Sequence, residues 1–148
     1  MAVDFATFLT TAPWILDSKL PILIRGRHGV GKSQVVYQIA DHRTLPVVER
    51  RASQMTEGDL LGLPDTADTE INGRKATTWN APDWLVVACT QPVLLFLDEV
   101  DRATPEVRQG LFELTDSRKI NGWHLHAETL IVAAVNGGEH GAQYQVGE

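Results

Sequence analysis

Short apolar runs divide the chain and predict the strands of a sheet. Three of them, residues 20–25, 93–97 and 130–135, consist almost wholly of branched and large apolar side chains. Continuous runs of this length are typical of parallel strands that are buried on both faces. A fourth strand is predicted over residues 46–52, where two valines precede charged residues.

Segments with helical spacing of apolar residues alternate with these strands. The spacing predicts helices over residues 3–9, 33–40, 82–88 and 104–116, and a shorter helical turn within residues 55–62. Thr56 or Asp59 is suited to cap the short turn, and Thr104 to cap the last helix, which has Pro105 in its first turn. The alternation predicts a three-layer α/β domain with a central parallel sheet and helices on both faces.

Two Asn-Gly pairs interrupt this pattern. Asn72-Gly73 and Asn121-Gly122 each lie between two short segments of extended character. Asn-Gly in that setting is a strong signal for a β-hairpin, because both turn positions need positive φ angles. The sequence therefore predicts two β-hairpin inserts.

Length and charge bound the domain organisation and the partners. The 148 residues suffice for one domain, residues 1–148, and the formal net charge is −6. This balance disfavours nucleic acid and anionic membranes as partners, and no apolar run is long enough to span a bilayer. Cys89 is the sole cysteine and is expected to be a small buried hydrophobe. A chain without an internal disulfide or a leader-like start is expected in the cytoplasm.

The strongest chemical signal lies between the first strand and the helix that follows it. Residues 26–33 read Gly-Arg-His-Gly-Val-Gly-Lys-Ser and fill every required position of G-x-x-x-x-G-K-[ST]. Glycines let successive N–H groups point at phosphate oxygens, and the helix start adds the positive end of its dipole. The predicted nucleotide-binding residues are Gly26, Arg27, His28, Gly29, Val30, Gly31, Lys32, Ser33 and Gln34.

Two side chains of this loop have specific expected roles. Lys32 is expected to reach the β- and γ-phosphates of ATP, and the Ser33 hydroxyl is expected to bind Mg²⁺. The alternative is a chance match in an ordinary glycine-rich turn. The strand before the loop and the helix after it favour nucleotide binding.

The apolar strand at residues 93–97 ends in a pair of acids, Asp98 and Glu99. In a chain with a phosphate loop, such a strand is a Walker B motif. Asp98 is expected to hold Mg²⁺ through its water shell, and Glu99 to accept a proton from the attacking water as a general base. The alternative is a solvated acidic start of a loop.

Asn136 follows the last apolar strand, at the same predicted edge of the sheet as Asp98. Its expected role is to orient the water opposite the γ-phosphate. Asn at a strand end is also a common turn residue, so this signal alone is weak.

Five stretches of the chain together resemble the MoxR-type AAA+ ATPases. They are the loop at 26–33, Gly-Asp-Leu-Leu-Gly-Leu-Pro at 58–64, Ala-Pro-Asp-Trp-Leu at 81–85, Leu-Phe-Leu-Asp-Glu-Val-Asp-Arg-Ala at 95–103, and Val-Ala-Ala-Val-Asn at 132–136. The resemblance covers nearly the whole chain. It implies a P-loop NTPase fold of AAA+ type, ATP and Mg²⁺ as ligands, and hydrolysis coupled to remodelling of a client protein.

The resemblance also implies roles for single residues and for the hairpins. Asn136 would be the sensor 1 residue, and the hairpins would face the central pore of a homo-oligomeric, hexameric ring. Arg102 matches a family arginine near the subunit boundary and is a candidate catalytic residue. Pairing of Arg102 with nearby acids is the alternative, since arginine commonly binds carboxylates.

The sequence departs from the family after Asn136. Family members continue to an arginine finger and a helical lid with a sensor 2 arginine, and no such motif follows here. Slow hydrolysis is expected, because an arginine finger typically contributes about 10³–10⁵-fold. A truncated nucleotide-binding module with little turnover and a P-loop small-molecule kinase remain open as alternatives.

Overall fold

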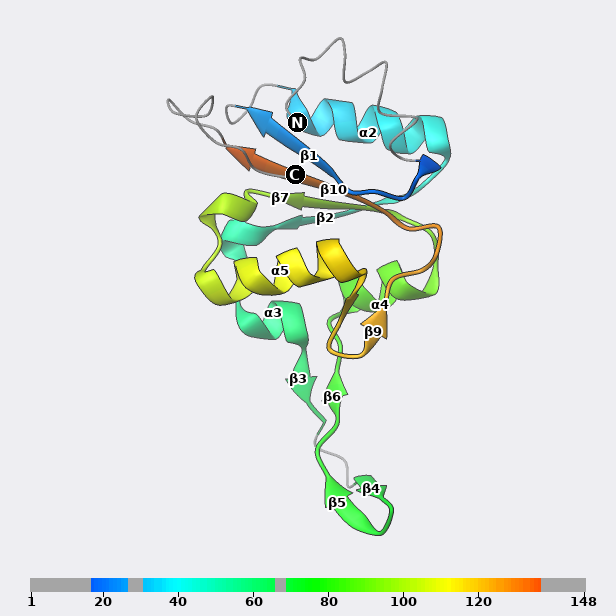
Figure 1. Cartoon of the computed structure of the whole chain (residues 1–148), viewed down its shortest axis with the longest axis vertical. Helices are drawn as coiled ribbons and strands as arrows, with labels where there is room; N and C mark the ends of the chain where they lie inside the picture. Colours follow the sequence, from blue (N-terminus) through cyan, green and yellow to red (C-terminus); the bar gives the residue numbers. More distant parts are fainter. Residues whose placement is uncertain (1–16, 27–30, 66–68, 137–148) are drawn as a thin grey trace.

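A four-stranded parallel sheet forms the centre of the molecule (Figure 1). The computed structural model describes residues 17–26, 31–65 and 69–136. The strands of the sheet are β1 (Ile22–Gly26), β2 (Val47–Arg51), β7 (Leu94–Asp98) and β10 (Leu130–Asn136). They lie in the order β1-β10-β7-β2, and every pair is parallel. The four predicted strands are therefore present, within two residues of their predicted ends.

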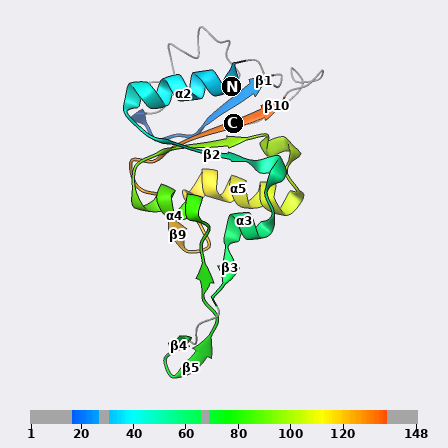
Figure 2. The ribbon, with the colours of Figure 1, turned by 180° about the vertical axis from the view of Figure 1, so that it is seen from behind.

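Helices cover both faces of this sheet, which Figure 2 shows from behind. One face carries α2 (Lys32–Arg43), and the other carries α3 (Glu57–Leu61), α4 (Asp83–Thr90) and α5 (Pro105–Ser117). The predicted three-layer α/β class is confirmed. The helix predicted over residues 3–9 lies outside the described residues.

The side chains of the two inner strands alternate between two hydrophobic clusters. Leu94 and Phe96 of β7 point to the cluster under α2, whereas Leu95 and Leu97 point to the cluster under α4 and α5. All four of these residues have no exposed surface. Such burial on both faces is why the segment reads as an unbroken apolar run.

β1 is less buried than the sequence predicts. Ile22 is 5% exposed, but Leu23, Ile24 and Arg25 are only half-buried. Among the described residues β1 pairs with β10 alone, so it lies at an edge of the sheet. An apolar run in the sequence cannot tell a central strand from an edge strand.

The short helix α3 is fixed by a reciprocal cap. The Thr56 hydroxyl accepts from the backbone N–H of Asp59 at 3.2 Å, and the Asp59 carboxylate accepts from the backbone N–H of Thr56 at 2.9 Å. The hydrogen bonds that this carboxylate accepts from the backbone N–H and the hydroxyl of Thr56 hold the pKa of Asp59 below its ordinary value. Both predicted capping residues thus act together. The predicted cap of α5 is also confirmed, since the Thr104 hydroxyl accepts from Val107.

The first predicted hairpin is the end of an arm, defined here as residues 63–80, that projects from the body (Figure 1). Its stem pairs β3 (Leu63–Pro64) with β6 (Trp79–Asn80), and its tip pairs β4 (Thr69–Ile71) with β5 (Arg74–Ala76). Asn72 and Gly73 form the turn with φ angles of 53° and 77°, as predicted. The second predicted hairpin pairs β8 (Lys119–Ile120) with β9 (Trp123–His124).

The prediction that Cys89 is buried holds only in part. Cys89 is half-buried rather than fully buried, and this partial burial raises the pKa of its thiol. It packs at the margin of the cluster under α4, because it is in the last turn of that helix. Within the described ranges, no helix is both long and apolar enough to cross a bilayer.

Candidate nucleotide-binding site

The carboxyl ends of the strands bring the predicted site residues to one edge of the sheet. The register places Gly26 of β1 opposite Asn136 of β10, and Asp98 of β7 opposite Arg51 of β2. Ligands of open α/β sheets bind at this edge. Arg27, His28, Gly29 and Val30 of the predicted loop lie outside the described residues.

Lys32 is anchored at this end of the sheet, between β1 and β10. Its ammonium group donates to the carbonyl oxygen of Gly26 at 2.9 Å and to that of Val135 at 3.2 Å. One carbonyl belongs to β1 and the other to β10, so the charge is held where these two strands end. A cation in this position can bind an anion that approaches the sheet edge.

The N-terminus of α2 adds backbone donors beside this cation. Gly31 is the N-cap residue in the left-handed region, with φ 65°, and no side chain caps the helix. The first backbone hydrogen bond of the helix runs from Val35 to Gly31, so the preceding N–H groups have no acceptor within the helix. Ser33 and Gln34 are exposed at this end. Together with Lys32, these groups are suited to bind phosphate.

The acid pair at the end of β7 is buried. Asp98 is 7% exposed and Glu99 is 8% exposed, which differs from a solvated acidic loop. The Asp98 carboxylate accepts from the backbone N–H of Glu99 at 2.9 Å. Glu99 takes a left-handed conformation, with φ 54°, before the short 3₁₀ helix η2 (Val100–Arg102). The turn therefore begins at the acid pair itself.

Glu99 has two partners that sequence reasoning missed. The Ser53 hydroxyl donates to Glu99 Oε2 at 2.8 Å, and Arg51 Nε lies 3.4 Å from the same oxygen. Arg51 ends β2, and Ser53 belongs to the 3₁₀ helix η1 (Ala52–Gln54) that follows. These contacts draw the Glu99 carboxylate toward β2. Nothing in the sequence signals them, because they depend on which strand pairs with β7.

The turn after β7 contains Arg102 and contacts the end of β10, which carries Asn136. The backbone N–H of Asn136 donates to the Asp101 carboxylate at 3.3 Å, which links the end of β10 to η2. The Arg102 side chain is exposed. Within the described part of the chain Arg102 forms no ion pair, so the alternative role, pairing with nearby acids, is not observed there.

The residues present fit a magnesium ion that is bound mainly by phosphate and water. The Ser33 hydroxyl and the Asp98 carboxylate are hard oxygen donors, which Mg²⁺ prefers. The described residues contain no group of three or more His, Cys, Asp or Glu that could hold a metal ion. This donor set suits a metal that arrives with nucleotide rather than one held in a protein cage.

Solved structures share this fold at low sequence identity. RuvB of Thermotoga maritima, a Holliday junction branch migration motor, matches with a TM-score of 0.58 and 16% identity over 92% of this chain and 40% of RuvB. A candidate ATPase from Cytophaga hutchinsonii matches with a TM-score of 0.58 and 17% identity over 96% of this chain and 42% of the other. The fold is therefore that of the P-loop AAA+ NTPases.

A family model and a sequence relative narrow this class. The model of the AAA domain of the dynein-related subfamily matches residues 21–143. Midasin of Giardia intestinalis is 32% identical over 100 residues, which are 67% of this chain and 2% of midasin. The chain belongs to this AAA domain family, and it spans about 2% of the length of midasin.

Proposed function

We propose that this chain binds ATP with Mg²⁺ and hydrolyses it, as the single-domain nucleotide-binding core of a MoxR-like remodelling ATPase. The observation that carries the proposal is the placement of Lys32 between the ends of β1 and β10, at the same sheet edge as the buried Asp98-Glu99 pair. Membership of the AAA domain family supports it.

In this proposal, ATP binds through the loop and the start of α2. Lys32 would exchange its carbonyl partners for phosphate oxygens, and the backbone N–H groups at the start of α2 would bind further oxygens. Ser33 and Asp98 would hold Mg²⁺, directly and through water respectively. The metal ion supplies neutralisation of charge on the phosphates.

Hydrolysis requires Glu99 and Asn136 to act on a water molecule. Glu99 would accept the proton of the attacking water, and Asn136 would orient that water. Ser53 and Arg51 already engage Glu99 Oε2, so this oxygen must exchange these partners before it accepts a proton. We therefore expect slow turnover from this state. The same contacts favour the second candidate, a module that binds nucleotide with little hydrolysis.

The assembly and the client are further parts of the proposal. We propose a homo-oligomeric, hexameric ring in the cytoplasm that acts on a protein client. The exposed Arg102, one residue beyond the contact between Asp101 and Asn136, is free to reach a neighbouring subunit and act as a catalytic residue there. Nucleic acid is not a proposed partner, in view of the net charge of −6.

A titration with ATP and Mg²⁺ tests the binding step. Lys32→Ala is expected to lose measurable ATP binding, because it removes the cation at the sheet edge, and to keep the melting temperature of the parent. Lys75→Ala is the matched control, since Lys75 is an exposed lysine on the arm. Equal ATP affinity of Lys32→Ala and the parent would show that the phosphate-loop assignment is wrong.

Phosphate release separates hydrolysis from the alternatives. We expect the parent to release phosphate from ATP without any added acceptor, and to do so faster at higher protein concentration if a ring forms. Binding without release would favour the non-hydrolysing module. Consumption of ATP that depends on a small-molecule acceptor would favour the kinase.

A further inference from the structure

A groove lies at the root of the arm, between α3, α5 and the β8–β9 hairpin. It has a volume of about 510 Å³, and Leu60, Leu61 and Ile120 form its apolar floor. Gly110 of α5 keeps this floor tight, because a Cβ there would collide with the Leu60 side chain. Close packing between α3 and α5 thus forms the bottom of the groove.

Three carboxylates surround this apolar floor. Glu57 comes from α3, and Glu106 and Glu113 lie two helical turns apart on the same side of α5. In the described ranges of the chain, none of the three forms an ion pair with a lysine, arginine or histidine. A surface that brings an apolar side chain together with a cation would complement this groove in both shape and charge.

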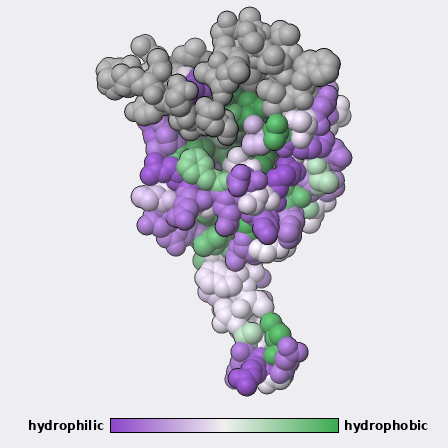
Figure 3. Space-filling view, in the orientation of Figure 1, coloured by the Kyte–Doolittle hydropathy of each residue, from purple (hydrophilic) through white to green (hydrophobic). Residues whose placement is uncertain are grey.

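The tip of the arm is such a surface. Cross-strand pairing places Ile71 opposite Arg74 and Thr69 opposite Ala76, so these four residues share one face of the tip. Ile71 is 54% exposed, and Figure 3 shows apolar surface at the tip among hydrophilic residues. This face carries one cation and no carboxylate. The other face pairs Glu70 with Lys75, whose charges offset each other.

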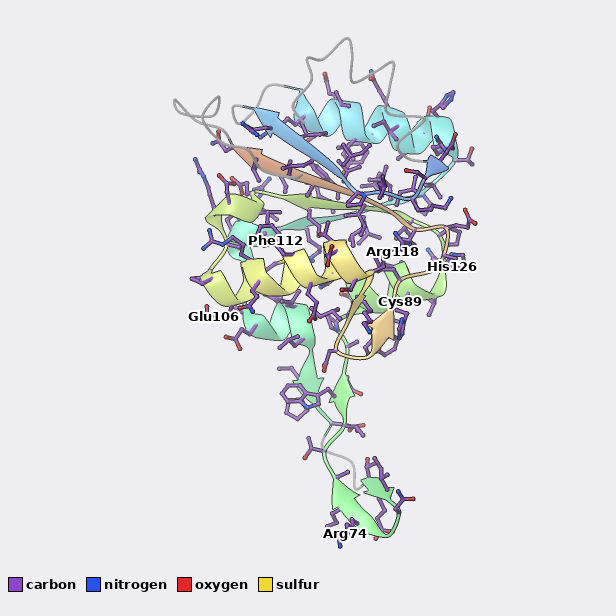
Figure 4. All side chains as sticks on the ribbon, in the orientation of Figure 1. Arg74, Cys89, Glu106, Phe112, Arg118 and His126 are labelled. Atoms are coloured by element: carbon purple, nitrogen blue, oxygen red, sulfur yellow. The ribbon has the colours of Figure 1, made fainter. Side chains whose placement is uncertain are left out.

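We infer that, without nucleotide, the groove binds the tip of the arm of a second copy of this chain, in a dimer distinct from the ring proposed above. Figure 4 shows Arg74 at the far end of the arm and Glu106 on the body, so the tip does not reach the groove of its own chain. In a second copy, Ile71 would enter the apolar floor and Arg74 would meet the carboxylates of Glu106 and Glu113.

The position of the groove makes this exchange symmetric. α3 ends at Leu61 and β3 begins at Leu63, so the groove lies where the arm starts. Two arms that run antiparallel about a two-fold axis therefore place each tip at the root of the other. The stems would then lie side by side and cover Leu63 and Trp79, which are 67% and 51% exposed.

Sedimentation velocity over a series of protein concentrations, without nucleotide, tests this inference. The parent chain is expected to form a dimer that weakens with salt. Ile71→Asp and Arg74→Glu are each expected to weaken the dimer by about tenfold or more, as central interface residues do. Lys75→Glu is the matched control on the other face of the tip, and is expected to change the dissociation constant much less.

A charge exchange makes the test specific for the groove. Glu113→Arg alone should weaken the dimer, and Glu113→Arg combined with Arg74→Glu should restore a large part of the loss. A parent chain that stays monomeric up to about 1 mM would overturn the inference. So would equal effects of Lys75→Glu and Arg74→Glu, or a double variant no better than the single ones.

This contact is independent of the proposed nucleotide site. Lys32→Ala should self-associate as strongly as the parent chain, because Lys32 lies at the sheet edge and not on the arm. A short basic peptide with one large apolar residue could instead prefer the groove. If such a peptide binds while the parent remains a monomer, the occupant is another protein and the inference of a second copy is wrong.

Discussion

The carboxyl edge of the sheet and the projecting arm are built by opposite means. At the sheet edge, parallel strands from distant parts of the sequence end near one another and bring Gly26, Asp98 and Asn136 to the same edge. In the arm, a local turn and a few cross-strand pairs determine the shape, and large apolar residues remain exposed. Chemistry that needs fixed geometry is therefore expected at the edge, and recognition of a partner is expected at the arm.

The largest expected effect is a loss of ATP hydrolysis, without loss of ATP binding, when the general base at the sheet edge is replaced. Glu99→Gln should slow ATP hydrolysis by roughly 10²–10⁴-fold, which is the range for loss of a positioned general base. ATP binding should change little, because the substitution keeps the size of the side chain. Phosphate release and an ATP titration on the same preparation check both statements. Equal hydrolysis rates would remove the catalytic role from Glu99.

The next expected effect concerns the core that supports this edge. Phe96→Ala should lower the free energy of unfolding by about 3–5 kcal/mol, because it leaves a cavity in a fully buried strand. Phe112→Ala is the matched control, since Phe112 is 50% exposed on α5. Denaturant unfolding should show a much smaller change for the control. Similar losses in both variants would contradict the two-cluster description of the core.

A smaller effect is expected at a buried hydroxyl that links the last turn of α4 to the starts of β7 and β10. The hydroxyl of Thr129, which has no exposed surface, donates to the Ala88 carbonyl at 2.9 Å and accepts from the Val93 N–H at 3.3 Å. Thr129→Val should cost about 1–3 kcal/mol, because it leaves buried backbone groups without that partner. Thr90→Val provides the control, because Thr90 is exposed. Thermal and denaturant unfolding would measure the difference.

Local signals allowed much of this architecture to be predicted from the sequence. The apolar runs predicted the strands, and the two Asn-Gly pairs predicted turns whose residues do take positive φ angles. The helix predicted over residues 33–40 continues to Arg43, where Thr44 takes a left-handed conformation and ends the helix. No signal in the sequence marks this end, because threonine is not a typical C-cap residue. Such termination is a backbone property that few residue types encode.

The part of the site that the sequence did not predict depends on which strands pair with each other in the sheet. That Asp98, Asn136 and Lys32 belong together followed from their positions after predicted strands. The contacts of Glu99 with Ser53 and Arg51 did not, since they require the knowledge that β2 lies beside β7. The edge position of β1 and the groove beside α5 depend on the same kind of information.

The smallest expected effect lies at the tip of the arm. Gly73→Ala places a side chain at φ 77°, in the left-handed region, but the added Cβ meets no atom within 4 Å. The strain should therefore be about 1–2 kcal/mol and confined to the hairpin, which shares no core with the sheet. ATP binding and the unfolding of the body should stay as in the parent, while amide exchange within β4 and β5 should accelerate. Gly62→Ala is the contrasting variant, because a Cβ there would collide with the backbone carbonyl of Asn80 at the root of the arm. It should disturb the pairing of β3 with β6 and raise exchange along the whole arm. If Gly73→Ala destabilised the body as much as Gly62→Ala does, the arm tip would not be the independent local unit described above.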